Sequence, residues 1–154
     1  MSQKNFNSVI IPPKIAGIKS SVPMFTLAWH INQSFGMNLA CNLDWEKEVN
    51  TTIPAISFHQ HYFDVFEDVE LNWHLMKNKG SESWFFQSKP MFDYLFICNG
   101  DDIYNYFERA VNAIKQNPKI EFVHAFDFGL IKSKDAFFNN ILKTKLFIDD
   151  LSHV

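Results

Sequence analysis

Glycine, cysteine and arginine are all scarce in this sequence. It has 5 glycines, 2 cysteines and a single arginine, Arg109. Phosphate-binding and dinucleotide-binding loops need several closely spaced glycines, and isolated glycines cannot build one. Cys41 and Cys98 stand far apart and form no CxxC pair, so we expect two reduced thiols rather than a disulfide or a redox motif.

Positive charge is too thinly spread for a nucleic-acid surface. The formal net charge is −3, and the longest basic grouping is Lys132-Ser133-Lys134. Contacts to phosphates and bases require clustered arginine and lysine. No run approaches the roughly 20 apolar residues that a membrane span needs, and residues 1–8 are polar where a signal peptide would be apolar. We therefore expect a cytoplasmic protein that binds neither nucleic acid nor membranes.

Aromatic residues are abundant, above all the 17 phenylalanines. Lysine, asparagine and isoleucine are abundant beside them, and all four residue types have A/T-rich codons. We attribute the phenylalanine content to an A/T-rich genome rather than to a ligand cage. The length of 154 residues is that of one domain. We expect a single domain over residues 1–154, with a polar arm at 1–12 and an amphipathic segment at 135–154.

Two segments have the apolar spacing of a helix. The first follows Ser20-Ser21, which we expect to cap it, has Pro23 in its first turn and stops at Gly36. The second runs from Asp102 to Gln116, with acidic residues at its start. The spacing predicts buried faces made of Met24, Leu27, Ala28, Ile31 and Phe35 in the first helix and of Ile103, Phe107, Ala110, Val111 and Ile114 in the second.

Six segments have the pattern of strands, namely 14–19, 58–66, 69–75, 84–86, 91–98 and 120–126. Residues 91–98 are apolar on both faces, which predicts a strand in the middle of a sheet. A two-residue turn at Glu67-Asp68 would pair Phe66 with Val69, Tyr62 with Trp73 and His61 with His74. The order of elements predicts an α+β fold: a two-layer sandwich whose mainly antiparallel sheet of four to six strands carries two main helices on one face.

His59, His61 and His74 are the residues from which a metal site could be built. Alternate residues of a strand share a face, and the expected pairing brings His74 opposite His61. Three imidazoles within reach of one another could hold Zn²⁺ and leave a fourth position for water. Phe63 and Val65 share that face, however, and histidines on an exposed strand face are the simpler interpretation.

Asp93 and Tyr94 are polar residues at the start of the apolar strand. A carboxylate in that place must be paired, hydrogen-bonded or neutral. We expect a structural carboxylate that accepts hydrogen bonds from a nearby turn, because one Asp without a second acid or a nucleophile makes no recognisable mechanism. The alternative is that Asp93 and Tyr94 are the polar anchors of a small-ligand pocket between helices and sheet.

Val22, Phe25 and Trp29 form an apolar line on the first helix, away from its buried face. Phe25 and Trp29 are four residues apart and therefore lie on one side of the helix. Either another segment of the chain covers this line, or the line is a protein–protein surface, since contiguous exposed apolar residues mark interaction sites.

Three stretches resemble a family of small bacterial proteins named for the motif Ile-Pro-Glu-x-x-x-Asp-Tyr, the IPExxxDY family. They are Leu27-Ala28-Trp29-His30-Ile31-Asn32, Asp93-Tyr94-Leu95-Phe96-Ile97 and Leu130-Ile131-Lys132-Ser133-Lys134-Asp135. Asp93-Tyr94 match the close of the motif, while Gln87, Ser88 and Lys89 stand where the family has Ile, Pro and Glu. The resemblance implies a small, soluble, cytosolic single domain and brings no activity, cofactor or catalytic residue.

The sequence has no recognisable catalytic set, and we expect no cofactor. The leading hypothesis is a non-enzymatic adaptor domain that contacts a protein partner, or a second copy of itself through the first helix. The alternatives are a metal-binding module or metal-dependent enzyme built on His59, His61 and His74, and a small-ligand-binding domain.

Overall fold

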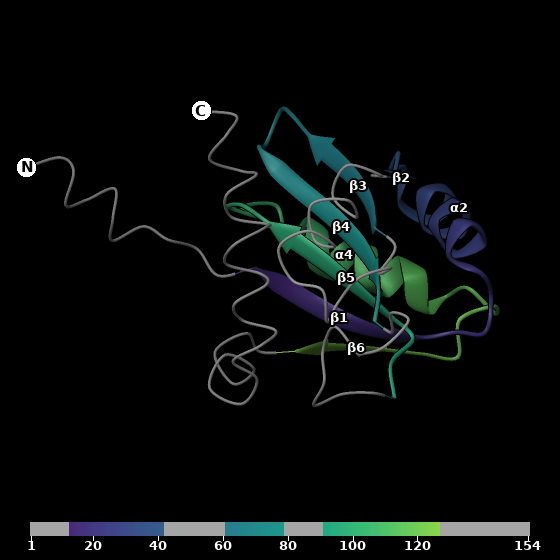
Figure 1. Cartoon of the computed structure of the whole chain (residues 1–154). Coiled ribbons are helices and arrows are strands. Elements are labelled where there is room, and N and C mark those ends of the chain that lie inside the picture. The colour runs from purple at the N-terminus through teal and green to yellow at the C-terminus, as the bar shows by residue number, and fades with distance from the viewer. Residues whose placement is uncertain (1–12, 42–60, 79–90, 127–154) are drawn as a thin grey trace, which may run out of the picture.

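The computed structural model describes residues 13–41, 61–78 and 91–126, which form one sheet and two helices. The sheet has six strands in the order β2-β3-β4-β5-β1-β6, and neighbouring strands are antiparallel (Figure 1). The strands are β1 (Lys14–Lys19), β2 (Ala40–Cys41), β3 (His61–Phe66), β4 (Leu71–Lys77), β5 (Tyr94–Asn99) and β6 (Phe122–Phe126).

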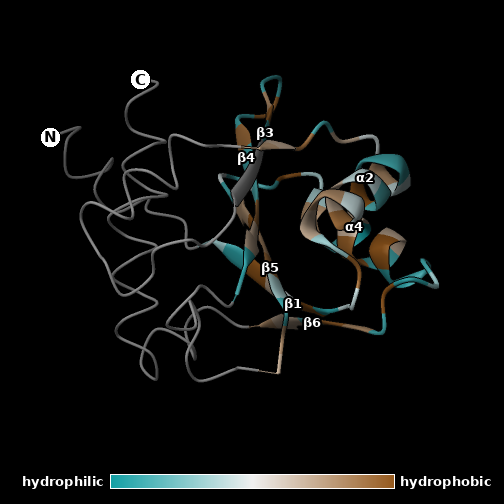
Figure 2. Cartoon of the chain, turned by 45° about the vertical axis from the view of Figure 1, so that its right-hand side comes forward, coloured by the Kyte–Doolittle hydropathy of each residue, from teal (hydrophilic) through white to brown (hydrophobic). Residues whose placement is uncertain are grey.

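Both helices, α2 (Met24–Phe35) and α4 (Tyr106–Lys115), lie on the same face of this sheet (Figure 2). The predicted two-layer α+β sandwich is therefore confirmed. All six residues of β5 are buried, and this strand lies inside the sheet, as its apolar pattern predicted. Neither of the described helices is long and apolar enough to cross a membrane.

A column of aromatic rings joins the two layers. Trp73 of β4 stacks on Phe96 of β5, with 5.4 Å between ring centroids, and Phe96 stacks on Phe107 of α4 at 5.9 Å. Phe35 of α2 meets Trp73 edge-on at 6.3 Å. Buried aromatic side chains each remove a large apolar area from water, so this column fixes both helices over the sheet.

Helix α2 has the predicted end and four of the five predicted buried residues, while the fifth, Phe35, is half-buried against the core. Its buried residues are Met24, Leu27, Ala28 and Ile31. Gly36 follows the helix in the left-handed conformation (φ 64°, ψ 35°), which glycine adopts without a steric penalty. The predicted cap is wrong, because Pro23 occupies the N-cap position and no side chain caps the first turn. Ser20 instead donates its hydroxyl to the carbonyl of Lys119, at 2.9 Å.

Helix α4 begins later than its apolar spacing predicted. The Asp102 carboxylate accepts hydrogen bonds from the backbone N–H groups of Tyr106 (2.7 Å) and Phe107 (2.8 Å). It also pairs with the Lys14 ammonium group at 3.3 Å. The chain turns between Asp102 and the helix, so Ile103 is 62% exposed and is not part of the buried face.

The hairpin between β3 and β4 has a four-residue turn, and the predicted two-residue turn is wrong. Residues 67–70 form the turn, and Glu70 takes a left-handed backbone conformation (φ 54°). Phe66 therefore pairs with Leu71, and His61 pairs with Met76 rather than with His74. The register is shifted by two residues from the predicted one, and an even shift keeps Phe66 on the same face as Trp73, as predicted.

Gly17 of β1 leaves room for an aromatic ring against the sheet. A Cβ atom at this position would lie 2.5 Å from the ring of Phe92. Phe92 is 2% exposed and also contacts the rings of Phe122 and Phe126 in β6, at 5.9 and 5.3 Å. The glycine thus lets Phe92, two residues before β5, pack directly on β1.

Several predictions concern residues outside the described ranges. They are the polar arm at 1–12, the short strand at 84–86 and the amphipathic segment at 135–154. These stay predictions, as does the single domain over the whole chain.

Candidate interaction surface on helix α2

Helix α2 carries no Asp, Glu, Lys or Arg, which is unusual for a helix on the outside of a sheet. These four residue types are absent everywhere between Lys19 and Asp44. A helix that covers a sheet normally has charged residues on its outer side, and α4 has them at Glu108, Arg109 and Lys115. This uncharged stretch can be read from the sequence, but the predicted surface was based on the apolar line of Val22, Phe25 and Trp29 alone.

Two aromatic side chains stand on the outer side of α2. Phe25 is 67% exposed and Trp29 is 57% exposed. Their spacing of four residues places them next to each other along the helix. Val22, the third member of the predicted line, is half-buried and packs against the core. The exposed apolar part of the line is therefore Phe25 and Trp29.

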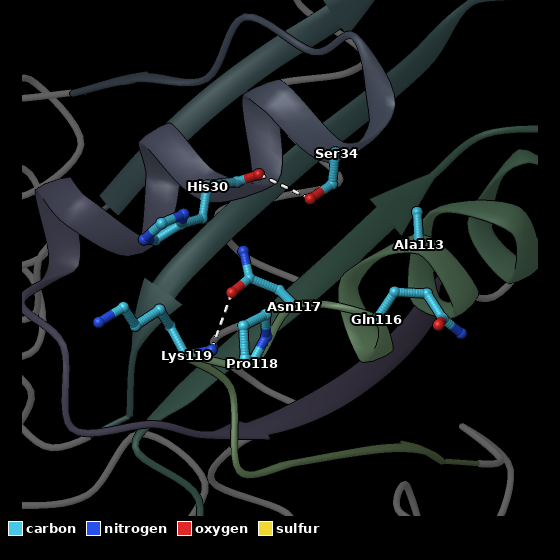
Figure 3. A pocket seen from close by; sticks show the side chains of 7 residues that line it. All are labelled: His30, Ser34, Ala113, Gln116, Asn117, Pro118 and Lys119. Carbon is cyan, nitrogen blue, oxygen red and sulfur yellow. Dashed lines mark hydrogen bonds between the residues drawn. The ribbon is translucent and has the colours of Figure 1, made fainter.

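A shallow groove lies between α2 and the C-terminal end of α4 (Figure 3). Its volume is about 560 Å³. Trp29 is adjacent to it, because its ring meets the ring of His30 edge-on, with 5.1 Å between centroids. Phe25, Trp29 and the groove form one surface, which we call the α2 surface. The groove is lined by His30 and Ser34 of α2, Ala113 of α4, and Gln116, Asn117, Pro118 and Lys119 that follow α4.

Asp93 and Tyr94 hold the segment that leads into α2. The Asp93 carboxylate accepts a hydrogen bond from the backbone N–H of Ser20 at 3.0 Å. The Tyr94 hydroxyl donates to the backbone carbonyl of Val22. The backbone N–H of Asp93 also donates to the carbonyl of Ile18 at 2.9 Å. These bonds tie the β1–α2 connection to the start of β5 and so fix the position of the α2 surface.

These contacts assign the polar groups of Asp93 and Tyr94 to the fold. Burial raises the pKa of Tyr94 above its ordinary value of 10.0, and the neighbouring Asp93 carboxylate raises it further. The hydroxyl therefore keeps its proton at neutral pH and can donate it to Val22. Both side chains bond to the backbone of the β1–α2 connection, so no described contact favours a ligand pocket anchored on them.

Of the three histidines of the predicted metal site, the structure describes the side-chain surroundings of His74 alone. His74 is completely buried, and burial lowers its pKa from 6.5 to about 3. It is therefore neutral at physiological pH, and the expectation of an exposed histidine face is wrong at this position. His61 pairs with Met76, and His59 lies outside the described ranges. No three His, Cys, Asp or Glu residues in the described part of the chain are placed to hold a metal ion.

Comparison of the chain with protein-family models, with curated proteins and with solved structures finds no match. The resemblance to the IPExxxDY family therefore stays a prediction. The functional interpretation depends on the geometry of the α2 surface itself.

Proposed function

We propose that this protein is a cytoplasmic, non-enzymatic interaction domain that binds a protein partner through the α2 surface. The observation that carries the proposal is an outer helix without charge that exposes Phe25 and Trp29 side by side. The proposed membership of the IPExxxDY family agrees with it, because the resemblance brings no catalytic residue.

The physical chemistry of the two rings supports a binding role. Aromatic side chains are enriched at the centres of protein interfaces, and a few of them typically account for most of the binding free energy. The bonds of Asp93 and Tyr94 to the β1–α2 connection hold the start of the helix in place before binding. A surface that is already ordered loses less conformational entropy when a partner docks.

A peptide-display selection tests the proposal. Random peptides are selected on the immobilised full chain, and the affinities of the enriched peptides are measured for the wild type and for a Phe25→Ser/Trp29→Ser double variant. We expect the double variant to lose at least about tenfold in affinity, because interface aromatic residues typically contribute more than about 1 kcal/mol each.

Ile103→Ser is the matched control for this selection. Ile103 is 62% exposed, much like Phe25 and Trp29, but it lies before α4 and outside the α2 surface. Its replacement should leave the affinities unchanged. Failure to enrich any peptide, or equal binding to the double variant and the wild type, would overturn the proposal.

Self-association through α2 is one form of the same proposal. Sedimentation equilibrium at micromolar concentration measures it directly. A homodimer through α2 should become monomeric in Trp29→Ser and stay dimeric in Ile103→Ser. A monomeric wild type excludes the homodimer and leaves another protein as the partner.

A further inference from the structure

Two rows of side chains on opposite flanks of the outer side of α2, about 140° apart around the helix axis, differ in chemical character. Phe25 and Trp29 form one row, and His30 and Ser34 form the other, with a spacing of four residues within each row. The first row is aromatic and exposed, and the second row is one wall of the groove. A segment lying along α2 would therefore meet apolar rings on one side and polar groups on the other.

The residues that line the groove include one lysine and no acidic residue. His30 and Lys119 are the two basic residue types among its seven lining residues, and none of the seven is Asp or Glu. Figure 3 shows these two side chains at the same end of the groove. Within the described ranges Lys119 makes no ion pair, and α2 supplies no carboxylate. Among the described residues, no carboxylate competes with that of a partner for the ammonium group of Lys119.

The two rings alone are too small for a stable interface. An aromatic side chain buries about 150–250 Å² when it is fully buried, so the exposed parts of Phe25 and Trp29 offer roughly 190–310 Å² together. A standard interface buries about 800 Å² on each partner. Symmetric packing of two α2 helices through these rings falls well short of that area. A stable complex therefore requires a partner that also occupies the groove.

We propose that the α2 surface binds an amphipathic segment of another protein that presents apolar side chains beside a carboxylate. The apolar side chains pack on Phe25 and Trp29, and the carboxylate pairs with Lys119 at the end of the groove. This inference rests on the proposed function and adds the chemical class of the partner. Charge complementarity at the edge of an apolar contact is the usual source of specificity in such complexes.

The sequences of the selected peptides and one charge reversal test this inference. We expect the enriched peptides to combine apolar residues with Asp or Glu, compared with the starting library. Lys119→Glu should weaken their binding about tenfold, because it replaces attraction by repulsion at the end of the groove. Lys115→Glu is the control, since Lys115 is exposed on α4 but does not line the groove. Raising the salt concentration should weaken binding to the wild type and not to Lys119→Glu.

The outcomes for the inference and for the proposed function can be told apart. Enriched peptides without acidic residues, or unchanged binding to Lys119→Glu, would overturn the inference. If the same peptides still fail to bind Phe25→Ser/Trp29→Ser, the proposed function stands without it. Peptides that bind the double variant normally would overturn both. A wild-type dimer that Lys119→Glu dissociates would make a second copy the occupant and overturn the choice of another protein.

Discussion

Removal of the Asp93 carboxylate should destabilise the fold by about 2 kcal/mol. Asp93→Ala deletes the acceptor for the backbone N–H of Ser20, a residue that is 3% exposed. A buried donor left without an acceptor costs about 1–3 kcal/mol. Asp93 is itself half-buried, so solvent screens part of its charge and keeps the cost below the top of that range. Asp93→Asn should cost only about 1 kcal/mol, because the amide oxygen can still accept the bond.

Equilibrium unfolding in urea measures these differences in the free energy of unfolding. Tyr94→Phe should cost about 1 kcal/mol, since it removes the hydrogen bond to the Val22 carbonyl and little packing. Asp68→Ala is the control: Asp68 is exposed in the β3–β4 turn, and its loss should change stability by less than about 0.5 kcal/mol. An unchanged or raised midpoint for Asp93→Ala would refute the structural assignment. It would make Asp93 a strained site of the kind that trades stability for activity.

Three further sites of the fold can be tested in the same way. Asp102→Ala should cost about 2–3 kcal/mol in urea unfolding, because it leaves two N–H groups of α4 without an acceptor. Lys14→Ala should cost less than about 1 kcal/mol, because the Lys14 side chain is 43% exposed. Equal costs for the two substitutions would contradict this account of the Asp102 contacts. Below pH 6.5 the unfolded chain binds a proton at His74 that the folded protein does not, so stability should fall by about 1.4 kcal/mol per pH unit towards pH 3. His74→Phe should remove that part of the slope, and an unchanged slope would contradict the burial of a neutral imidazole. Gly17→Ala should displace the Phe92 ring and cost about 1–3 kcal/mol, and a thermal midpoint equal to the wild type would contradict the contact.

Local patterns predicted those elements whose ends and faces are set by their own residues. Gly36 ends α2 as expected, and the alternation along 71–75 places Trp73 in the core. The predictions failed where a more distant residue decides the local structure. Asp102 binds the first N–H groups of α4 across an intervening turn, so Ile103 is exposed although it fits the apolar spacing. The length of the β3–β4 turn was predicted wrongly for a different reason: residues 67–70 contain no favoured turn sequence that would mark it.

The candidate site was predictable in part, for the same reason. The helical spacing alone placed Phe25 and Trp29 away from the buried face of α2. The groove beside them was not predictable, because its walls come from α2 and from residues 116–119, which only the packing of the two helices brings together. The sequence predicted that the carboxylate of Asp93 would be hydrogen-bonded to a turn, whereas its partner, the N–H of Ser20, lies 73 positions away along the chain.

The position at which a selected peptide binds tests the central claim most directly. A peptide from the display selection is titrated into the isotope-labelled full chain, and the shifts of the backbone and indole N–H signals are mapped by NMR. We predict the largest shifts at Phe25, at Trp29 including its indole N–H, and at His30, with smaller shifts at Lys119. Shifts concentrated on β6 or around Ile103, with the signals of α2 unchanged, would contradict the assignment of the binding surface to this helix.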